Sequence, residues 1–303
     1  MTGRAGRGDR VFATAALAAA VVIMVALAAV FVFLAARGAD GLHAPRSLYE
    51  PAAGSFWGYA GKLLYGTTFA AVLAMVIAVP FSVTLALFIS HYAPRRLAVP
   101  IAYVIDLLAA VPSVVFGLWG ARTLASTTRP VQEWLSAHLG WFPLFAGDAS
   151  ATGRTLGVAA VVLAIMILPI TTAICREVFQ QTPRLVEEAA LGLGATRWEM
   201  IRLSVFPHAR SGIVAGMMLG LGRALGETMA ISMVLSASPL VTLKILTSDN
   251  PATIASNIAA NYNSEDTRIQ TVLIATGLVL FLFTFVVNFA ARWIVTRSNR
   301  GLA

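Results

Sequence analysis

Long uninterrupted stretches of apolar residues are the dominant pattern along this chain. A helix that crosses a membrane needs about 20 consecutive, mostly apolar residues. Six segments reach this length and contain at most two charged residues each: Val11–Ala36, Leu63–Ser90, Leu97–Ala121, Thr155–Cys175, Ser211–Ser238 and Ile269–Ala291. The pattern therefore predicts an all-α membrane protein with six transmembrane helices.

The first segment has an alternative interpretation as a cleaved signal peptide, because Arg4, Arg7 and Arg10 form a basic region before it. Its apolar run is much longer than the ~7–15 residues of a signal sequence, which favours a retained helix. Lys and Arg are more frequent on the side of the N-terminus, and such residues concentrate in cytoplasmic loops. We therefore expect both termini to lie in the cytoplasm.

Three polar connections are longer than a simple turn. With this orientation, residues 123–153 and 239–268 lie outside the cell and residues 176–210 lie inside. The first outer connection contains an amphipathic piece, Val131–Leu139, and aromatic residues such as Trp141 that suit a membrane interface.

The composition agrees with a membrane environment. Of the 303 residues, 58% are hydrophobic and 12% are charged, whereas soluble proteins carry about 25% charged residues. The net charge of +8 could indicate a nucleic-acid partner, but an excess of Lys and Arg in cytoplasmic loops explains it better. Cys175 is the single cysteine, so no disulfide can form within the chain.

The inner connection, residues 176–210, has the pattern of a helical hairpin. Thr182-Pro183 is typical of a helix start, and Gly192 or Gly194 can end that first helix. Thr196-Arg197-Trp198-Glu199 matches a capping box, which begins a second helix. Pro207 is expected to stop the second helix. Such a hairpin could dock into a groove of a partner or lie on the membrane surface, and the pattern alone leaves both open.

The same hairpin contains a recognisable motif. Glu188-Ala189-Ala190-Leu191-Gly192-Leu193-Gly194, followed by Phe206-Pro207, resembles the EAA loop of ABC importer permeases. Ser204 and Phe206 stand where the family usually has Ile and Leu. The resemblance implies the permease fold of type I ABC importers, in which this loop docks into an ATPase subunit. Coupling residues implied in this way are Glu188, Ala189, Ala190, Gly194 and Pro207.

Three charged residues fall inside the apolar segments, where each costs about 2.5–3.5 kcal/mol at the bilayer centre. Arg223 and Glu227 are four residues apart, so on one helix they share a face and can pair. Gly212, Gly216 and Gly220 in the same segment would let a neighbouring helix approach closely. The pair could be structural, or it could release the arginine toward an anion, and the residues alone favour neither.

Asp106 is the third membrane charge and precedes Pro112, which should kink its helix. It could line a transport pathway as a counter-charge. A structural role, in which Asp106 is bonded to a neighbouring helix or is protonated, is the interpretation that we favour.

A second resemblance suggests the substrate. Gly222-Arg223-Ala224-Leu225-Gly226-Glu227-Thr228-Met229 resembles the signature of phosphate importer permeases, and the segment Val111–Gly120 resembles their PstC-type subunit. This implies that Arg223 and Glu227 belong to a substrate pathway or gate, with Asp106 a weaker candidate. Sulfate and molybdate permeases share Arg-Ala-Leu-Gly-Glu, so those substrates remain alternatives.

The resemblance also implies partners and a location. They are a homologous PstA-type permease subunit, two PstB-type ATPase subunits, a PstS-type phosphate-binding protein and the lipid bilayer of a bacterial inner membrane. The chain lacks a phosphate-binding P-loop, so ATP and Mg²⁺ would be used by the separate ATPase, and no cofactor is expected in this chain.

Other classes are less well supported. A secondary transporter is disfavoured by the EAA hairpin and by the absence of repeated halves. An enzyme is disfavoured because no catalytic set lies at one membrane depth. The four histidines are isolated from one another, so no metal site is expected.

The expected organisation has three parts. Residues 1–62 hold the N-terminal tail, first helix and outer loop, residues 63–295 form the permease core with the hairpin at 176–210, and residues 296–303 form a cytoplasmic tail.

Overall fold

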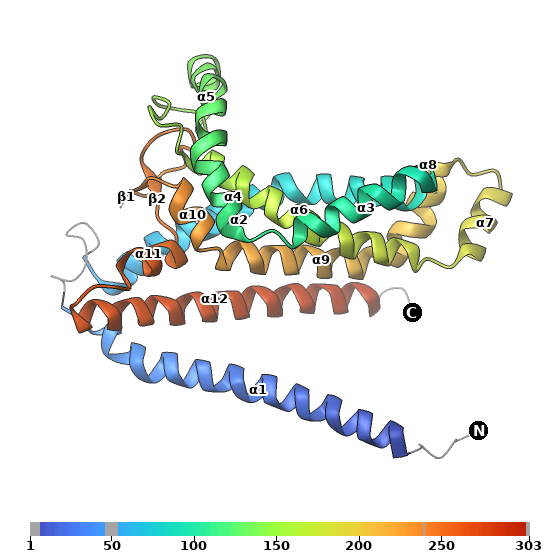
Figure 1. The fold of residues 1–303 in the computed structure, drawn as a ribbon, viewed down its shortest axis with the longest axis horizontal. Helices are drawn as coiled ribbons and strands as arrows, with labels where there is room; N and C mark the ends of the chain where they lie inside the picture. The colour runs from blue at the N-terminus through green and yellow to red at the C-terminus, as the bar shows by residue number, and fades with distance from the viewer. Residues whose placement is uncertain (1–6, 46–53, 239, 301–303) are drawn as a thin grey trace.

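The computed structural model describes residues 7–45, 54–238 and 240–300. Arg4 of the basic tail, part of the first outer loop, Pro239 and the last three residues lie outside the described residues. The regular secondary structure of the described residues is helical apart from a short parallel bridge between β1 (Ala237–Ser238) and β2 (Asn250–Pro251). The long helices run along one axis, with α5 and the β-bridge toward one end and α7 and α8 at the other (Figure 1).

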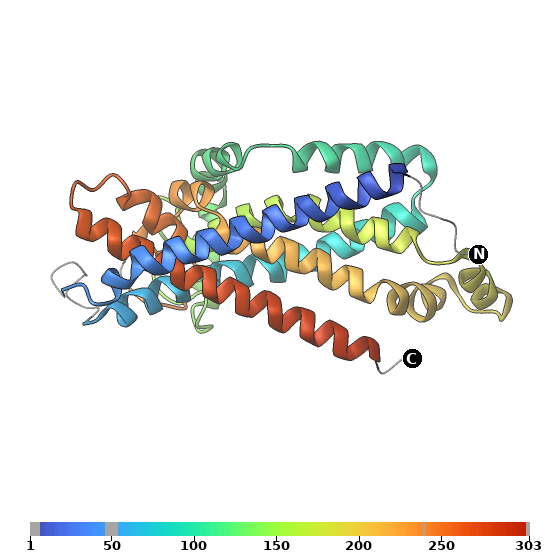
Figure 2. The same cartoon turned by 90° about the horizontal axis from the view of Figure 1, so that it is seen from below.

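Four helices in the described part are long and apolar enough to cross a membrane. They arise from the long apolar runs of the sequence: α1 (Arg7–Leu42), α2 (Phe56–Leu87), α6 (Leu156–Gln180) and α12 (Thr267–Arg300). A π-helical turn, η2 (Phe88–Tyr92), extends α2. The helix α1 lies outside the bundle beside α12 (Figure 2).

The third predicted segment is broken at Pro112. The helix α3 (Arg95–Ala109) ends before this proline, and α4 (Ser113–Trp119), η3 (Gly120–Leu124) and α5 (Ala125–Leu139) follow it. The two parts are bent by 93°, because proline cannot continue the backbone hydrogen bonding of α3. The predicted kink is confirmed, and the amphipathic piece Val131–Leu139 is helical as part of α5.

The fifth predicted segment, Ser211–Ser238, is not one helix. The helix α9 (Phe206–Gly226) ends inside it, Glu227 and Thr228 form a break, and α10 (Met229–Val234) follows. With the bent pair counted as one, the described helices give up to five candidate spans. The all-helical prediction is therefore confirmed, whereas the number of six membrane helices is not.

The helix α6 lies at the centre of the bundle and packs against α2, α3 and α9. Its contact with α9 depends on glycines in the predicted stripe. A Cβ atom at Gly220 would lie 2.6 Å from Cγ2 of Ile167, and one at Gly216 would lie 3.2 Å from Cγ2 of Ile174. The missing side chains let the two helices approach closely.

This packing predicts different outcomes for two neighbouring glycines. Gly220→Val should push α9 away from α6 and destabilise the protein by about 1–3 kcal/mol through overpacking. Gly222→Ala is the control, because a Cβ atom there meets nothing within 4 Å. Thermal unfolding of the purified protein in detergent measures both, and equal melting temperatures would contradict the packing described.

At the end of the molecule opposite α7, loops from three parts of the chain meet at Asn250, which is completely buried. Its Oδ1 accepts from the Leu156 amide at 2.8 Å, and its Nδ2 donates to the carbonyl oxygens of Arg154, Ser236 and Ser248. One side chain thus joins the start of α6 to the segment after α10.

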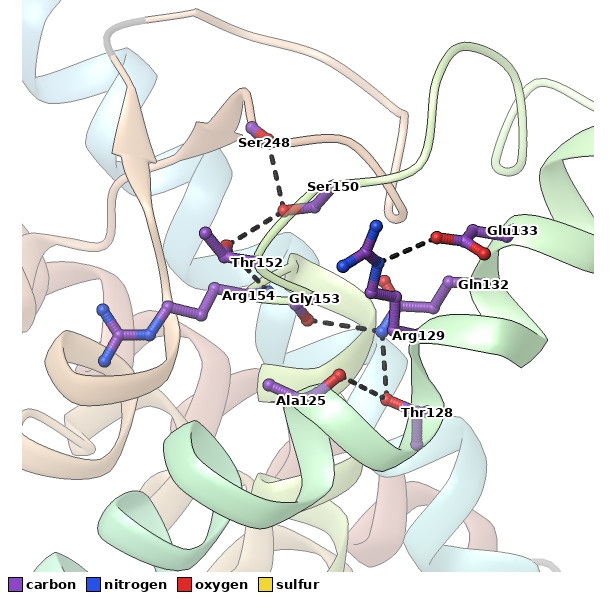
Figure 3. A network of polar contacts seen from close by, with 10 residues as sticks. All are labelled: Ala125, Thr128, Arg129, Gln132, Glu133, Ser150, Thr152, Gly153, Arg154 and Ser248. Carbon is purple, nitrogen blue, oxygen red and sulfur yellow. Dashed lines mark hydrogen bonds and ion pairs between the residues drawn. The ribbon is translucent and has the colours of Figure 1, made fainter.

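A second set of hydrogen bonds attaches α5 to these loops (Figure 3). Gln132 donates from Nε2 to Thr128 Oγ1 at 3.0 Å and to the Gly153 carbonyl at 3.3 Å. Ser248 donates to Ser150 across a sequence separation of 98 residues. Together with Asn250, these bonds join the two connections that the sequence predicts to lie outside, residues 123–153 and 240–268, into one cross-linked unit, called here the outer unit.

Asn250→Ala should therefore destabilise the outer unit. It would leave the buried amide of Leu156 without its acceptor, and each unpaired buried group costs about 1–3 kcal/mol. Limited proteolysis between α10 and α11 (Ile254–Asn261) is the measurement. The control is Asn261→Ala, whose exposed side chain donates a hydrogen bond within its own turn, to the Asn257 carbonyl. Equal cleavage rates for the two variants would refute the role of Asn250.

Candidate functional site

The predicted hairpin is present, and its first helix has a different N-cap from the one predicted. The helix α7 (Arg184–Gly192) has Pro183 rather than Thr182 as its N-cap, and Gly194 takes φ +86 in the bend. The capping box is confirmed, since Thr196 and Glu199 exchange hydrogen bonds at the start of α8 (Arg197–Met200). The hydrogen bonds from Thr196 lower the pKa of Glu199, which keeps this cap ionised.

Pro207 does not end the second helix, contrary to prediction. The chain continues from α8 through the π-helical turn η4 (Ile201–Val205) into α9, and Pro207 lies in the first turn of α9. Proline is tolerated there because it directly follows the π-helical turn, where the regular α-helical hydrogen bonding is already interrupted. The hairpin is therefore connected to α9 without a loop.

One side of the hairpin is exposed and apolar. No residue of α7 is buried, and the side chains of Leu185 and Leu193 are 79% and 91% exposed. Among the expected coupling residues, Glu188 and Ala189 are exposed as well. Exposed leucines together on one short element are typical of a surface that another protein covers.

The other side of the hairpin contacts the bundle. Val205 and Phe179 are buried in one apolar cluster, and Ala190 packs against that cluster. Nε2 of His91, in the π-helical turn η2 that follows α2, lies 3.5 Å from Oε1 of Glu187 in α7. The helix α7 is thus in direct contact with an apolar cluster to which α2, α6 and α9 all contribute residues.

The charged pair predicted in the fifth segment has a different arrangement. Arg223 lies in the last turn of α9, and Glu227 follows the end of that helix in extended conformation. Within the described residues no ion pair joins them, so the predicted pairing on one helix face is wrong. The physical reason is the break, which removes the helical spacing on which the pairing depends.

Glu227 instead stabilises the break. Its side chain is 8% exposed, and its Oε1 accepts a hydrogen bond from the Ala230 amide at 3.1 Å. Amides in the first turn of a helix have no partner within that helix. The carboxylate therefore serves α10 as a cap, and its charge benefits from the positive end of the helix.

Arg223 borders a groove of about 850 Å³ between α9 and α12. Its Nε atom is buried and makes no hydrogen bond within the described part of the chain. Beyond the break, Gly226 and Thr228 line a separate pocket of about 470 Å³ with residues of α11. Arg223 thus lies at the border between a helix break and a groove, and a guanidinium is the side-chain group that best suits an oxyanion.

Asp106 is bonded to a neighbouring helix, the alternative that the sequence favoured. Its Oδ2 lies 3.7 Å from Nη2 of Arg176 in α6, and its side chain is 53% exposed. This ion pair links α3 to α6, and Arg223 is not part of it. A search of the described residues finds no group of three or more His, Cys, Asp or Glu side chains that could hold a metal ion.

Comparison with known proteins relates this geometry to a family. Residues 78–300 match the family described as binding-protein-dependent transport system inner membrane component. A protein of Mycobacterium tuberculosis named phosphate transport system permease protein PstC 2 is 44% identical over 98% of this chain and 94% of its own length. The Mesorhizobium japonicum protein named phosphate transport system permease protein PstC is 35% identical, over 96% of this chain and 91% of its own.

The fold also has solved relatives. A structure of the MetNI methionine ABC transporter in an inward-facing conformation aligns with a TM-score of 0.53 at 18% identity, covering 82% of this chain and 98% of that one. At this identity the likeness shows the fold alone. Together with the apolar helices, the family match shows a multi-pass membrane protein.

The cap made by Glu227 can be tested separately from transport. Glu227→Ala removes the acceptor of the Ala230 amide and should destabilise α10 by about 1 kcal/mol, as for other lost caps. Glu227→Gln keeps a side-chain oxygen and should retain most of the stability. Hydrogen exchange of the Ala230 amide is the measurement. Equal protection in the two variants would mean that the carboxylate does not hold the break.

Proposed function

This chain belongs to the family of binding-protein-dependent transport system inner membrane components, and we propose that it is one of two pore-forming subunits of an ATP-driven phosphate importer. The observation that carries the proposal is the 44% identity over 98% of the chain to a protein named as a phosphate transport permease. The chain is a permease and not an enzyme, because a separate subunit hydrolyses the ATP.

The proposed arrangement in the membrane has six crossings. Beyond the four long helices, the bent pair α3–α4 and the helix α9 with α10 each cross once. Both termini lie in the cytoplasm of a bacterium and the chain crosses its inner membrane. The orientation is supported by the position of the described ends of α1 and α12, which lie toward the same end of the molecule as the hairpin (Figure 1).

Three kinds of partner complete the importer. A homologous PstA-type subunit forms the other half of the pore, and two PstB-type ATPases dock on the hairpins of the two permeases. A PstS-type phosphate-binding protein docks at the outer unit around α5. The exposed leucines of α7 support the ATPase contact, and the hydrogen bonds of Asn250 give the outer unit the rigidity that docking needs.

In this proposal Arg223 contacts phosphate as it passes the break. Arg223 lines the groove and makes no ion pair among the described residues, and a guanidinium offers several fixed donors to an oxyanion. Glu227 acts indirectly, by holding the break that places Arg223 at the groove. Closing of the ATPases moves α7, and the direct connection through η4 carries that movement to α9.

The experiment that tests the function is ATP-dependent uptake of labelled phosphate by the reconstituted four-component complex. We expect uptake that stops without ATP and that a tenfold excess of sulfate or molybdate leaves nearly unchanged, since binding sites discriminate between ligands by differences in affinity. Preferential uptake of sulfate or molybdate would favour those permeases instead. Uptake that continues without ATP hydrolysis would favour a secondary transporter.

The hairpin generates a separate prediction. Leu193→Asp places a charge on an apolar contact surface, and Glu188→Lys reverses a charge there. Both should release the ATPase subunits from purified membranes, because burial of an unpaired charge costs several kcal/mol. Glu265→Lys is the control, since this exposed residue lies in the outer connection. Normal ATPase retention by Leu193→Asp would contradict docking on α7.

A further inference from the structure

The helix α7 is attached to the bundle along one narrow face. The structure describes all nine of its residues, and of these Glu187 and Ala190 are partly buried while the others are exposed. Glu187 and Ala190 are three residues apart and therefore lie on the same side of the helix. Gly194, with φ +86, separates α7 from α8. A force applied to α7 would bend the hairpin at this glycine unless the side of α7 is held elsewhere.

Glu187 is held by His91. Its Oε1 atom lies 3.5 Å from Nε2 of His91, and the side chains of His91 and Glu187 are 10% and 21% exposed. Polar contacts that are largely removed from water are stronger than the same contacts on an open surface. The contact therefore gives α7 a polar attachment beside the apolar one that Ala190 makes.

The ring of His91 is oriented by its neighbour Ser90. Nδ1 lies 2.7 Å from the Ser90 hydroxyl, which is also 2.8 Å from the Ala86 carbonyl oxygen. The partner of one ring nitrogen decides which nitrogen carries hydrogen. When Ser90 donates to Nδ1, the neutral ring has its hydrogen on Nε2. When Ser90 donates to Ala86, a ring with hydrogen on both nitrogens fits. In both arrangements Nε2 donates to Glu187.

Irregular backbone brings His91 to this position. It lies in the π-helical turn η2, in which the Ala93 amide bonds to the Phe88 carbonyl at 2.7 Å. A π-helical turn widens the helix by one residue and so redirects the side chains in it, and such turns occur frequently at functional sites. The turn is thus a second feature, independent of the side-chain contact, that distinguishes this point of α2.

Behind His91, a row of aromatic rings leads back to the hairpin. The ring centre of Phe179 in α6 lies 6.5 Å from that of His91 and 6.1 Å from that of Phe206 in α9. Trp198 of α8 lies 6.2 Å from Phe206. Ring pairs of this kind prefer defined edge-to-face arrangements. Both helices of the hairpin are therefore attached to one group of packed rings, α8 through Trp198 and α7 through His91.

We propose that the contact between His91 and Glu187, called here the inner latch, makes α7 move as one body with α2 and α6 and so couples ATP hydrolysis to transport. The inference rests on the function proposed above and adds two positioning residues that the sequence motifs do not indicate. Glu187 is on the side of α7 that faces the bundle, whereas Leu185 and Glu188 are exposed. The latch thus controls what the ATPase moves and not how tightly it binds.

The test is the ratio of phosphate taken up to ATP hydrolysed by the full reconstituted complex. His91→Phe keeps a ring beside Phe179 and removes the donor, and Glu187→Ala removes the acceptor. The control is Glu177→Ala, because Glu177 is an exposed residue of α6 that no ion pair joins within the described residues. Retention of the ATPase subunits and the melting temperature are measured on the same samples.

We expect both latch variants to retain the ATPase and to hydrolyse ATP, with a ratio about tenfold below that of the wild type. This is the effect of losing one hydrogen bond to a charged group. Glu177→Ala should leave the ratio unchanged, and Glu187→Gln, which keeps an oxygen acceptor, should recover part of it. A purely structural contact would lower the melting temperature without changing the ratio. An unchanged ratio, or loss of the ATPase from Glu187→Ala, would overturn the proposal.

The double variant shows whether the two residues act through one contact. If they do, His91→Phe combined with Glu187→Ala should lower the ratio no further than either change alone, because the contact can be lost only once. Independent effects would multiply to about a hundredfold. That result would also count against the latch, since each residue would then act through other partners.

The two proposals fail in different ways. If the wild-type complex takes up phosphate and the latch variants keep its ratio, the inner latch is wrong and the importer stands. If the wild-type complex takes up no phosphate, the proposed function itself is wrong, and the inner latch is wrong with it.

Discussion

The hydrogen bond from the Ala230 amide to the Glu227 carboxylate is the interaction on which the arrangement around Arg223 depends. Inside a membrane an unpaired backbone group costs several kcal/mol, so irregular backbone persists only where other groups satisfy it. Glu227 does this at the end of α9, and α10 then packs against α4. The approach is close, since a Cβ atom at Gly117 would lie 2.7 Å from the Cα of Ala230. Arg223 is consequently at a helix end beside a groove and not in the middle of a continuous helix.

The helix α6 connects this region to both ends of the molecule. Its first amide, at Leu156, is held by Asn250 in the outer unit, and its last turns carry Phe179, which packs beside His91 and Phe206 next to the hairpin. Along its length it meets the glycines of α9. Because packed interiors deform little, we expect a displacement of the hairpin to move α6 and α9 together, as the proposed alternating access requires.

Much of the fold could be predicted from sequence because its signals are local. Apolar length located the long helices, Pro112 located the bend, and Thr196 with Glu199 located a helix start. The break after Gly226 was missed, since it depends on a carboxylate reaching an amide three residues ahead and on packing of α10 against α4. The role of Asn250 could not be found either, because its partner Leu156 is 94 residues away. For Asp106 the sequence left two alternatives, and it could not indicate Arg176 as a neighbour, because the two residues are close only in the folded chain.

The central claim is that Arg223 contacts the transported anion, and the most direct test is phosphate uptake by the assembled complex carrying Arg223→Gln. The account predicts that uptake falls by about a hundredfold, as for a charged group removed from its buried ligand, while the complex assembles and its ATPase remains active. Arg223→Lys keeps the charge but not the fork of donors, and uptake should recover only partly. Uptake at the wild-type rate by Arg223→Gln would contradict the account and would leave Arg223 as a structural residue of α9.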